Sequence, residues 1–363
     1  MNIIGASGFL MKYGKAAKPI IYSLRTLPTL PFSGITAACM NIDQTTVYTC
    51  ISGGNIYKYT TASGLWTAAS GPAASAWGDI VCDDTGQYVV AVVKNTSAAG
   101  LYIWYSTDFG VNFTQSVSTV STNLESLAMS ANGQYVYTIS ISDNSQFFRS
   151  TNYGVTWTNV SANIGTNNGS RVCCDITGQY ILVAHRATGR IRFSFDYGTT
   201  FALPMSSTEN AGAYVTPRLY DKPTNTFAWY NLGFTGGAWT ALATQNISKA
   251  STVSAGILSN AISSLNAANT PTSVSGEKRL DTTTSGKRIM VAETIAAGNV
   301  YLCSDGMVGQ VTNGPSYAAN FVNLSSTLGI PQTSWKKVRS NSNESFVFCN
   351  TNKVYVYEWS YAA

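Results

Sequence analysis

Short segments in which apolar and small polar residues alternate recur along the chain. In residues 135–141, aromatic and β-branched side chains alternate with small polar ones, as expected of a strand with one buried face. A glycine-containing turn at residues 130–133 separates this segment from an apolar run at residues 126–129. Residues 146–149 form a third apolar segment after a second polar turn. The pattern predicts short antiparallel strands that are joined by tight turns.

An eight-residue motif, Ser-x-Asp/Asn-x-Gly-x-x-aromatic, occurs three times. The copies begin at Ser106, Ser150 and Ser194, and they are 44 residues apart both times. A second motif, Gly-Gln-Tyr after a polar residue, precedes each copy, at residues 85–88, 132–135 and 177–180. Each repeat therefore predicts one antiparallel sheet of four strands, about 45 residues long.

The eight-residue motif has a structural explanation. Its Ser and its Asp or Asn can hydrogen-bond the backbone of a turn, its Gly allows the chain to reverse, and its last aromatic residue covers the hairpin. We expect these residues to shape the turn between the third and fourth strands and to carry no chemistry. The motif positions are Ser106, Asp108, Gly110 and Phe113; Ser150, Asn152, Gly154 and Trp157; and Ser194, Asp196, Gly198 and Phe201.

Weaker copies of the glycine turn extend the repeat over the rest of the chain. The turns begin at Asn41, Asp83, Ser130, Asp175, Asp221, Thr283 and Asn341. One meander cannot bury both of its faces, so the units must stack, and four-stranded sheets stacked around an axis form a β-propeller. We therefore predict an all-β, seven-bladed β-propeller as the single domain of residues 1–363. The blades are expected at residues 34–70, 77–116, 123–160, 168–204, 212–260, 279–325 and 333–361.

The two ends of the chain are expected to complete one blade together. The seventh unit ends too early to supply a fourth strand, and residues 19–24, within a basic segment at residues 1–30, can supply it. This pairing would close the ring and remove exposed strand edges. Units one and five carry a shorter Gly-x-Trp in place of the motif, at residues 64–66 and 237–239. Residues 245–277, rich in Ser, Ala, Asn and Thr, predict long loops or an extra hairpin.

The eight-residue motif resembles the Asp-box, or BNR repeat, of sialidases and of photosystem-assembly-factor-like propellers. In those families the box lies on the outer rim, far from the axis where ligands bind, so the resemblance implies the fold and no particular chemistry. A sialidase also needs an Arg-Ile-Pro motif and three arginines that hold a carboxylate. This sequence has no Arg-Ile-Pro and no arginine between Arg25 and Arg149. The catalytic set is therefore not found, and no carboxylate pair can be nominated for glycoside hydrolysis.

Composition excludes several function classes. Charged residues make up 11% of the 363 residues, and the net charge of +5 is concentrated in Lys12, Lys15, Lys18 and Arg25, before the first acid. A nearly neutral remainder argues against a nucleic-acid groove, and the absence of a long apolar run argues against a membrane span. Seven cysteines without a Cys-x-x-Cys pair, and one histidine, predict no metal site, no disulfide framework and no cofactor. The cysteines are typical of buried residues in a reducing compartment.

A basic segment in the fourth unit is the candidate binding site. His185, Arg186, Arg190 and Arg192 surround an expected hairpin between the second and third strands, on the face that carries the connections between units. These cations could bind an acidic sugar or an acidic protein patch. The alternative is a solvated turn whose arginines pair with nearby carboxylates.

The sequence predicts a non-catalytic structural or binding propeller. Low charge with abundant Ser, Thr, Asn, Gly and Tyr resembles virion surface and fibre proteins. The first hypothesis is therefore a virion component that decorates a capsid or attaches to a host, with a capsid or assembly protein as its partner. Two alternatives stay open: a glycan-binding or glycoside-hydrolysing, sialidase-like propeller, and an intracellular scaffold for assembly.

Overall fold

The computed structural model is built almost entirely of β-strands. One short helix, α1 (Leu324–Thr327), is present in the part of the chain that the structure describes, and no helix there is long and apolar enough to cross a membrane. The described residues are 20–72, 74–94, 102–117, 123–140, 146–161, 169–185, 191–201, 218–222, 226–235, 238–248, 259–264, 278–282, 289–293, 296–303 and 321–361.

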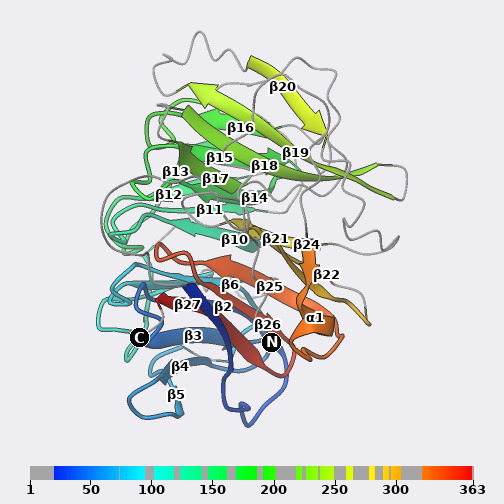
Figure 1. Cartoon of the computed structure of the whole chain (residues 1–363). Coiled ribbons are helices and arrows are strands. Elements are labelled where there is room, and N and C mark those ends of the chain that lie inside the picture. The colour runs from blue at the N-terminus through cyan, green and yellow to red at the C-terminus, as the bar shows by residue number, and fades with distance from the viewer. Residues whose placement is uncertain are drawn as a thin grey trace, which may run out of the picture.

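Four antiparallel sheets follow one another in the first part of the chain (Figure 1). Within each sheet, strands that are consecutive in sequence are neighbours, as the repeat predicts. The strands are β2 (Ile35–Met40), β3 (Thr46–Ile51), β4 (Ile56–Thr60) and β5 (Trp66–Ala68); β6 (Trp77–Cys82), β7 (Val89–Val93), β8 (Ile103–Ser106) and β9 (Thr114–Gln115); β10 (Leu124–Met129), β11 (Val136–Ser140), β12 (Phe147–Ser150) and β13 (Thr158–Asn159); and β14 (Gly169–Cys174), β15 (Ile181–His185) and β16 (Ile191–Ser194).

Three further sheets complete the described part of the chain. Each has four antiparallel strands, and the last sheet combines β1, from the N-terminal part of the chain, with three strands from the C-terminal part. The strands are β17 (Arg218–Lys222), β18 (Thr226–Thr235), β19 (Ala238–Ser248) and β20 (Ser259–Ser264); β21 (Lys278–Thr282), β22 (Ile289–Glu293), β23 (Val300–Cys303) and β24 (Phe321–Asn323); and β25 (Trp335–Ser340), β26 (Phe346–Asn350), β27 (Val354–Tyr361) and β1 (Ile20–Thr26).

One turn prediction is wrong. The Gly-x-Trp at residues 237–239 was expected between the third and fourth strands of its sheet. Trp239 instead pairs with Phe234 in the hairpin of β18 and β19, which are the second and third strands. The reason is strand length: β18 has 10 residues and β19 has 11, so the pairing continues to the pair Thr235 and Ala238 and takes in the tryptophan. β20 then supplies the fourth strand from within residues 245–277.

The first strands of the sheets contact one another in order. β2 contacts β6, which contacts β10; β10 contacts β14, and contacts continue through β17 and β21 to β25, which contacts β2. Apolar side chains fill the space between neighbouring sheets: Ala37 and Tyr48 of one sheet, for example, share a buried cluster with Trp77 and Val89 of the next. The core therefore lies between sheets, which is why single sheets cannot fold alone.

The pairing of β1 with β27 joins the two ends of the chain. All seven residues of β1 are paired, from Ile20 with Tyr361 to Thr26 with Tyr355. Arg25 Nε also lies 3.3 Å from the carboxylate of Glu358. Residues 20–26 thus form the strand that the sequence predicts for this position, next to the last strand of the chain.

The turns between the first and second strands of neighbouring sheets form backbone hydrogen bonds with one another. Ile42 N donates to Asp84 O, Asp84 N to Ala131 O, and Ala131 N to Ile176 O, at 2.8 to 2.9 Å. At the junction between the last and first sheets, the side-chain amide of buried Asn341 donates to the carbonyl of Ile42 at 3.0 Å. The same amide also donates to the carbonyl of Asn41 at 2.9 Å, so hydrogen bonds between these turns link each of these sheets to the next.

Two glycines with the same backbone angle allow a test of the packing between sheets. Gly110 and Gly64 have φ of +68° and +67°. A Cβ on Gly110 would lie 2.5 Å from Cε1 of Tyr48, whereas a Cβ on Gly64 would meet nothing within 4 Å. The Tyr48 ring is fixed because its hydroxyl donates to Gly86 O at 2.7 Å.

We expect Gly110→Ala to lower the free energy of unfolding by about 2–4 kcal/mol and Gly64→Ala by about 1 kcal/mol. Both variants carry the cost of a left-handed alanine, and only Gly110→Ala adds a steric clash. Urea unfolding followed by tryptophan fluorescence measures the difference. Equal losses would show that the ring of Tyr48 moves freely.

Candidate functional site

Five first strands have a β-bulge at the same place. The register shifts between the residues that flank Thr36, Gly78, Glu125, Ser170 and Lys336. These strands are the edges of their sheets and they contact one another, so their free edges face a common axis. A bulge redirects the side chain that follows it. Those side chains are Ala37, Asp79, Ser126, Arg171 and Lys337.

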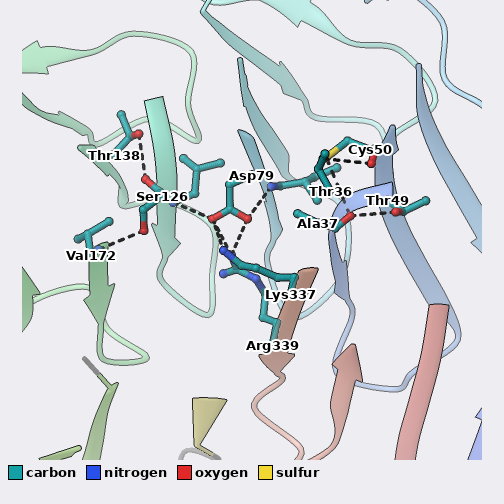
Figure 2. Close-up of polar contacts among 12 residues, drawn as sticks. Thr36, Ala37, Thr49, Cys50, Asp79, Ser126, Thr138, Val172, Lys337 and Arg339 are labelled. Carbon is teal, nitrogen blue, oxygen red and sulfur yellow. Dashed lines mark hydrogen bonds and ion pairs between the residues drawn. The ribbon is translucent and has the colours of Figure 1, made fainter. Parts of the chain in front are cut away.

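The carboxylate of Asp79 is completely buried at this axis (Figure 2). Its Oδ1 accepts from Ile80 N at 2.9 Å, and its Oδ2 accepts from Leu127 N at 3.0 Å. Lys337 Nζ donates to Oδ2 at 2.7 Å, and Nη2 of Arg339 lies 3.0 Å from both oxygens. These donors occupy all the acceptor positions of one carboxylate.

The charges around Asp79 decide its protonation. Burial alone would raise the pKa of Asp79, but the cations of Lys337 and Arg339 lower it to about 2. The carboxylate is therefore ionised and fully bonded at neutral pH. Because it can neither release nor accept a proton there, it is unsuited to general acid–base chemistry.

The two cations reach Asp79 across an intervening strand. Lys337 and Arg339 lie on β25 and Asp79 on β6, and both strands contact β2. At the positions on β2 that correspond to the two cations are the small residues Ala37 and Cys39. Small side chains there leave space for the longer ones. The ion pairs thus connect segments 258 and 260 residues apart in sequence.

Ser126, like Asp79, accepts a hydrogen bond from a backbone amide of the next sheet. Its Oγ accepts from Val172 N on β14 at 3.1 Å, and its carbonyl accepts from Thr138 Oγ1 at 3.0 Å (Figure 2). Asp79 bonds Leu127 N on β10 in the same way. Ala37 has no side-chain acceptor, and Asp79 bonds the corresponding amide of its own strand, Ile80 N. These side chains therefore satisfy backbone donors at the free inner edges.

Lys337 has a lowered pKa. Burial, with the nearby charges of Arg339 and Arg171, outweighs the attraction of Asp79 and lowers the pKa of Lys337 to about 7. Its side chain is 14% exposed. The axial cluster, by which we mean Asp79, Lys337, Arg339 and Arg171, thus combines one anion with three basic groups.

Of the basic segment expected to bind a ligand, the structure describes His185 and Arg192. His185 is the last residue of β15, and Arg192 lies in β16, paired with Val183. Arg186 and Arg190 fall outside the described residues. Because β16 is the third strand of its sheet, Arg192 is not brought to the axis. A binding role for this hairpin stays a prediction.

The three eight-residue motifs form nearly identical turns. In the first, Ser106 Oγ donates to Asp108 Oδ1 at 2.8 Å and accepts from Gly110 N at 3.0 Å, and Asp108 accepts from Asn112 N at 2.9 Å. The copies at Ser150 and Ser194 repeat these bonds. The first two turns join the third and fourth strands of their sheets.

These hydrogen bonds also affect the acids of the motif. Burial favours a higher pKa for Asp108 and Asp196, but the bonds that each carboxylate accepts within its turn hold the pKa below its usual value. These carboxylates therefore stay ionised and stabilise their own turns by accepting hydrogen bonds.

A signal for the axial cluster exists in the sequence. Four residues before the turn starts at Asp83, Ser130, Asp175 and Asn341 stand Asp79, Ser126, Arg171 and Lys337. The same count from Thr283 gives Arg279, which lies on β21 and pairs with Ala292. Three of these four residues, Asp79, Arg171 and Lys337, are charged residues within a strand, and this repeated charge marks the position. Within the described residues, no group of three or more His, Cys, Asp or Glu side chains could hold a metal ion.

Comparison with known proteins identifies the fold. No protein-family model matches the chain, and no curated protein matches its sequence. Among solved structures, a GH74 xyloglucanase from Xanthomonas campestris has a TM-score of 0.58 at 12% identity, over 94% of this chain and 56% of that one. A GH74 enzyme from Niastella koreensis has a TM-score of 0.59 at 16% identity, over 89% and 52%.

A third structure matches over nearly its whole length. The β-propeller domain of Swd1 from Myceliophteria thermophila has a TM-score of 0.61 at 9% identity, over 92% of this chain and 99% of that one. This chain spans about half the length of the two GH74 chains. At such identities the likeness concerns the fold alone, and the fold of this chain is that of a β-propeller.

Removal of the Asp79 charge should destabilise the protein strongly. Asp79→Asn keeps the shape but leaves two buried cations without their counter-ion, so we expect a loss of about 3–5 kcal/mol in the free energy of unfolding. Asp43→Asn, an exposed acid in a turn of the first sheet, is the matched control and should change it by less than about 0.5 kcal/mol. Urea unfolding at pH 7 compares the two. Similar small losses would mean that Asp79 is dispensable.

The pH dependence of stability gives a second measurement. The pKa of Asp79 is lowered in the folded state, so its contribution is present above the unfolded pKa and is lost as the pH falls. We expect it to disappear between about pH 4 and pH 2, with a total of about 2 kcal/mol. Asp79→Asn should lack this part of the acid dependence, and an unchanged acid slope would contradict the assignment.

Proposed function

We propose that the chain forms a closed seven-bladed propeller and works as a non-catalytic binding module within a protein assembly. The contacts that run from β2 through the other first strands and back from β25 to β2 support a closed ring. So does the pairing of β1 with β27, which gives the last sheet its fourth strand. The three Ser-x-Asp/Asn-x-Gly turns fit an Asp-box role at the rim of such a ring.

The state of Asp79 is the observation that carries the non-catalytic role. Propellers use their axis for ligands and chemistry, and the acid at this axis is saturated by backbone donors and by Lys337 and Arg339. A glycosidase acid needs a raised pKa and a free proton, whereas the pKa of Asp79 lies near 2. The cluster supports a rigid ring that presents its loops and turns to a partner.

Composition supports one setting for this module. Low charge and many small polar residues favour a particle component, and a virion protein that binds a capsid or attaches to a host stays our first hypothesis. An intracellular assembly scaffold is the alternative. Hydrolysis of a glycan is the competing function, because two of the similar structures are GH74 enzymes.

Turnover and association test the proposal together. The native protein should release no reducing sugar from xyloglucan or from sialosides, and after chemical cross-linking in its native source it should sediment with a larger particle. Hydrolysis of either substrate by the native protein would contradict the proposal. A chain that sediments alone from that source would contradict the assembly role.

A further inference from the structure

The residue before the glycine of each eight-residue motif is aromatic and has an unusual backbone. Phe109, Tyr153 and Tyr197 have φ of +60°, +63° and +58°. The amide of each donates to the glutamine carbonyl of the Gly-Gln-Tyr turn in its own sheet, at 3.0 to 3.2 Å. A left-handed conformation is unfavourable for a residue with a side chain, so contacts of the ring are needed to offset it.

Two of these three rings are covered by a tyrosine of the preceding sheet. Tyr153 stacks on Tyr88, with ring centroids 4.0 Å apart, and Tyr197 lies against Tyr135 at 4.5 Å. Both covering residues are the tyrosine of a Gly-Gln-Tyr turn. Aromatic pairs at such distances stabilise the contact between two sheets. The two covered rings are half-buried.

The third ring, that of Phe109, has no tyrosine to cover it. On the first sheet Thr46 takes the place of the tyrosine. The amide of Thr46 donates to Asn41 Oδ1 at 2.9 Å, as the amide of Tyr88 donates to Asp83 Oδ1 at 2.8 Å. Because a threonine offers no ring for stacking, Phe109 is 47% exposed.

A cation without an ion-pair partner lies beside the exposed ring. Lys58 Nζ is 6.0 Å from the centre of the Phe109 ring, which is within the range of a cation–π contact. Among the described residues, the ammonium of Lys58 takes part in no hydrogen bond or ion pair. The nearby carboxylate of Asp108 instead accepts from Ser106 Oγ and from two groups of Asn112, within its own turn. The ammonium therefore keeps its donors for an acidic group.

We infer that Phe109 and Lys58 form a docking site for an aromatic side chain of a partner protein, next to an acidic residue of that partner. The incoming ring covers Phe109 as Tyr88 covers Tyr153, and the acidic group pairs with Lys58. Protein is favoured over sugar because the equivalent rings are covered by protein side chains. The inference rests on the proposed assembly role, since it names a contact through which the module binds its partner.

Titration with short peptides tests the site without the native partner. The probe is acetyl-Gly-Glu-Tyr-Glu-Gly-amide, and its binding to the full chain is followed by the NMR signals of the Phe109 ring and of Lys58 Cε. Both signals should shift. Peptides with Ala for Tyr, or with Gln for both Glu residues, should bind about threefold or more weakly. Methyl glucoside should shift neither signal, and tighter binding by the sugar would overturn the choice of a protein partner.

Two substitutions alter the ring contact in opposite ways. Phe109→Ala removes the ring, whereas Thr46→Tyr supplies the tyrosine that the other two junctions have and covers Phe109 from within the chain. Both should weaken binding of the tyrosine peptide by about fivefold or more. Leu65→Ala shortens another exposed apolar side chain, in a turn of the first sheet, and should leave the affinity within about twofold.

Thr46→Tyr and the matched peptides keep the inference testable if Phe109→Ala fails to fold. Equal binding of the tyrosine and alanine peptides, or an unchanged affinity in Thr46→Tyr, would overturn the docking site. Sedimentation from the native source separates this result from the proposed function. A native chain that sediments alone contradicts the assembly role, and the peptides still test the site. If the native chain and Thr46→Tyr sediment equally with a larger particle, the assembly role stands and the docking site is wrong.

Discussion

One buried carboxylate organises the centre of this molecule. Asp79 accepts from the amides of β6 and β10 and from two cations of β25, so four donor groups connect three separate sheets through one carboxylate. Desolvation of such charges is expensive, and only close cations and directed backbone donors offset it. The small residues of β2 at the same level make this possible, because they leave space for the lysine and arginine side chains to cross.

Hydrogen bonds join neighbouring sheets at several distances from the central axis. The first strands form the inner edges of their sheets, and at these edges the amides of Ile80 and Leu127 bond Asp79 and the amide of Val172 bonds Ser126. Turns between first and second strands donate to one another, and Asn341 makes the equivalent link with its side chain where the last sheet meets the first. Farther out, Ser70 exchanges two backbone hydrogen bonds with the turn at residues 111–113 of the next sheet. Neighbouring sheets are thus joined by polar contacts as well as by apolar packing.

Local features of the fold were predicted from the sequence, whereas the axial cluster was not. Alternating strands and Gly-Gln-Tyr turns depend on residues within a few positions of one another, and the meander they imply is the one observed. The pairing of residues 20–26 with β27 was predictable because the last sheet lacked a strand. The Gly-x-Trp at residues 237–239 was misplaced because its local pattern does not report strand length. The axial cluster was missed because its members lie up to 260 residues apart. Their shared position becomes visible only when the repeats are aligned with one another.

The antiparallel pair of β1 and β27 has a consequence for synthesis. A long interval of synthesis separates the strand at residues 20–26 from its partner at Val354–Tyr361. For most of that time β1 has no native neighbour on this side, and its backbone groups are open to a strand from another nascent chain. Exchange of this strand between two molecules is therefore the misassembly to which the topology is most exposed.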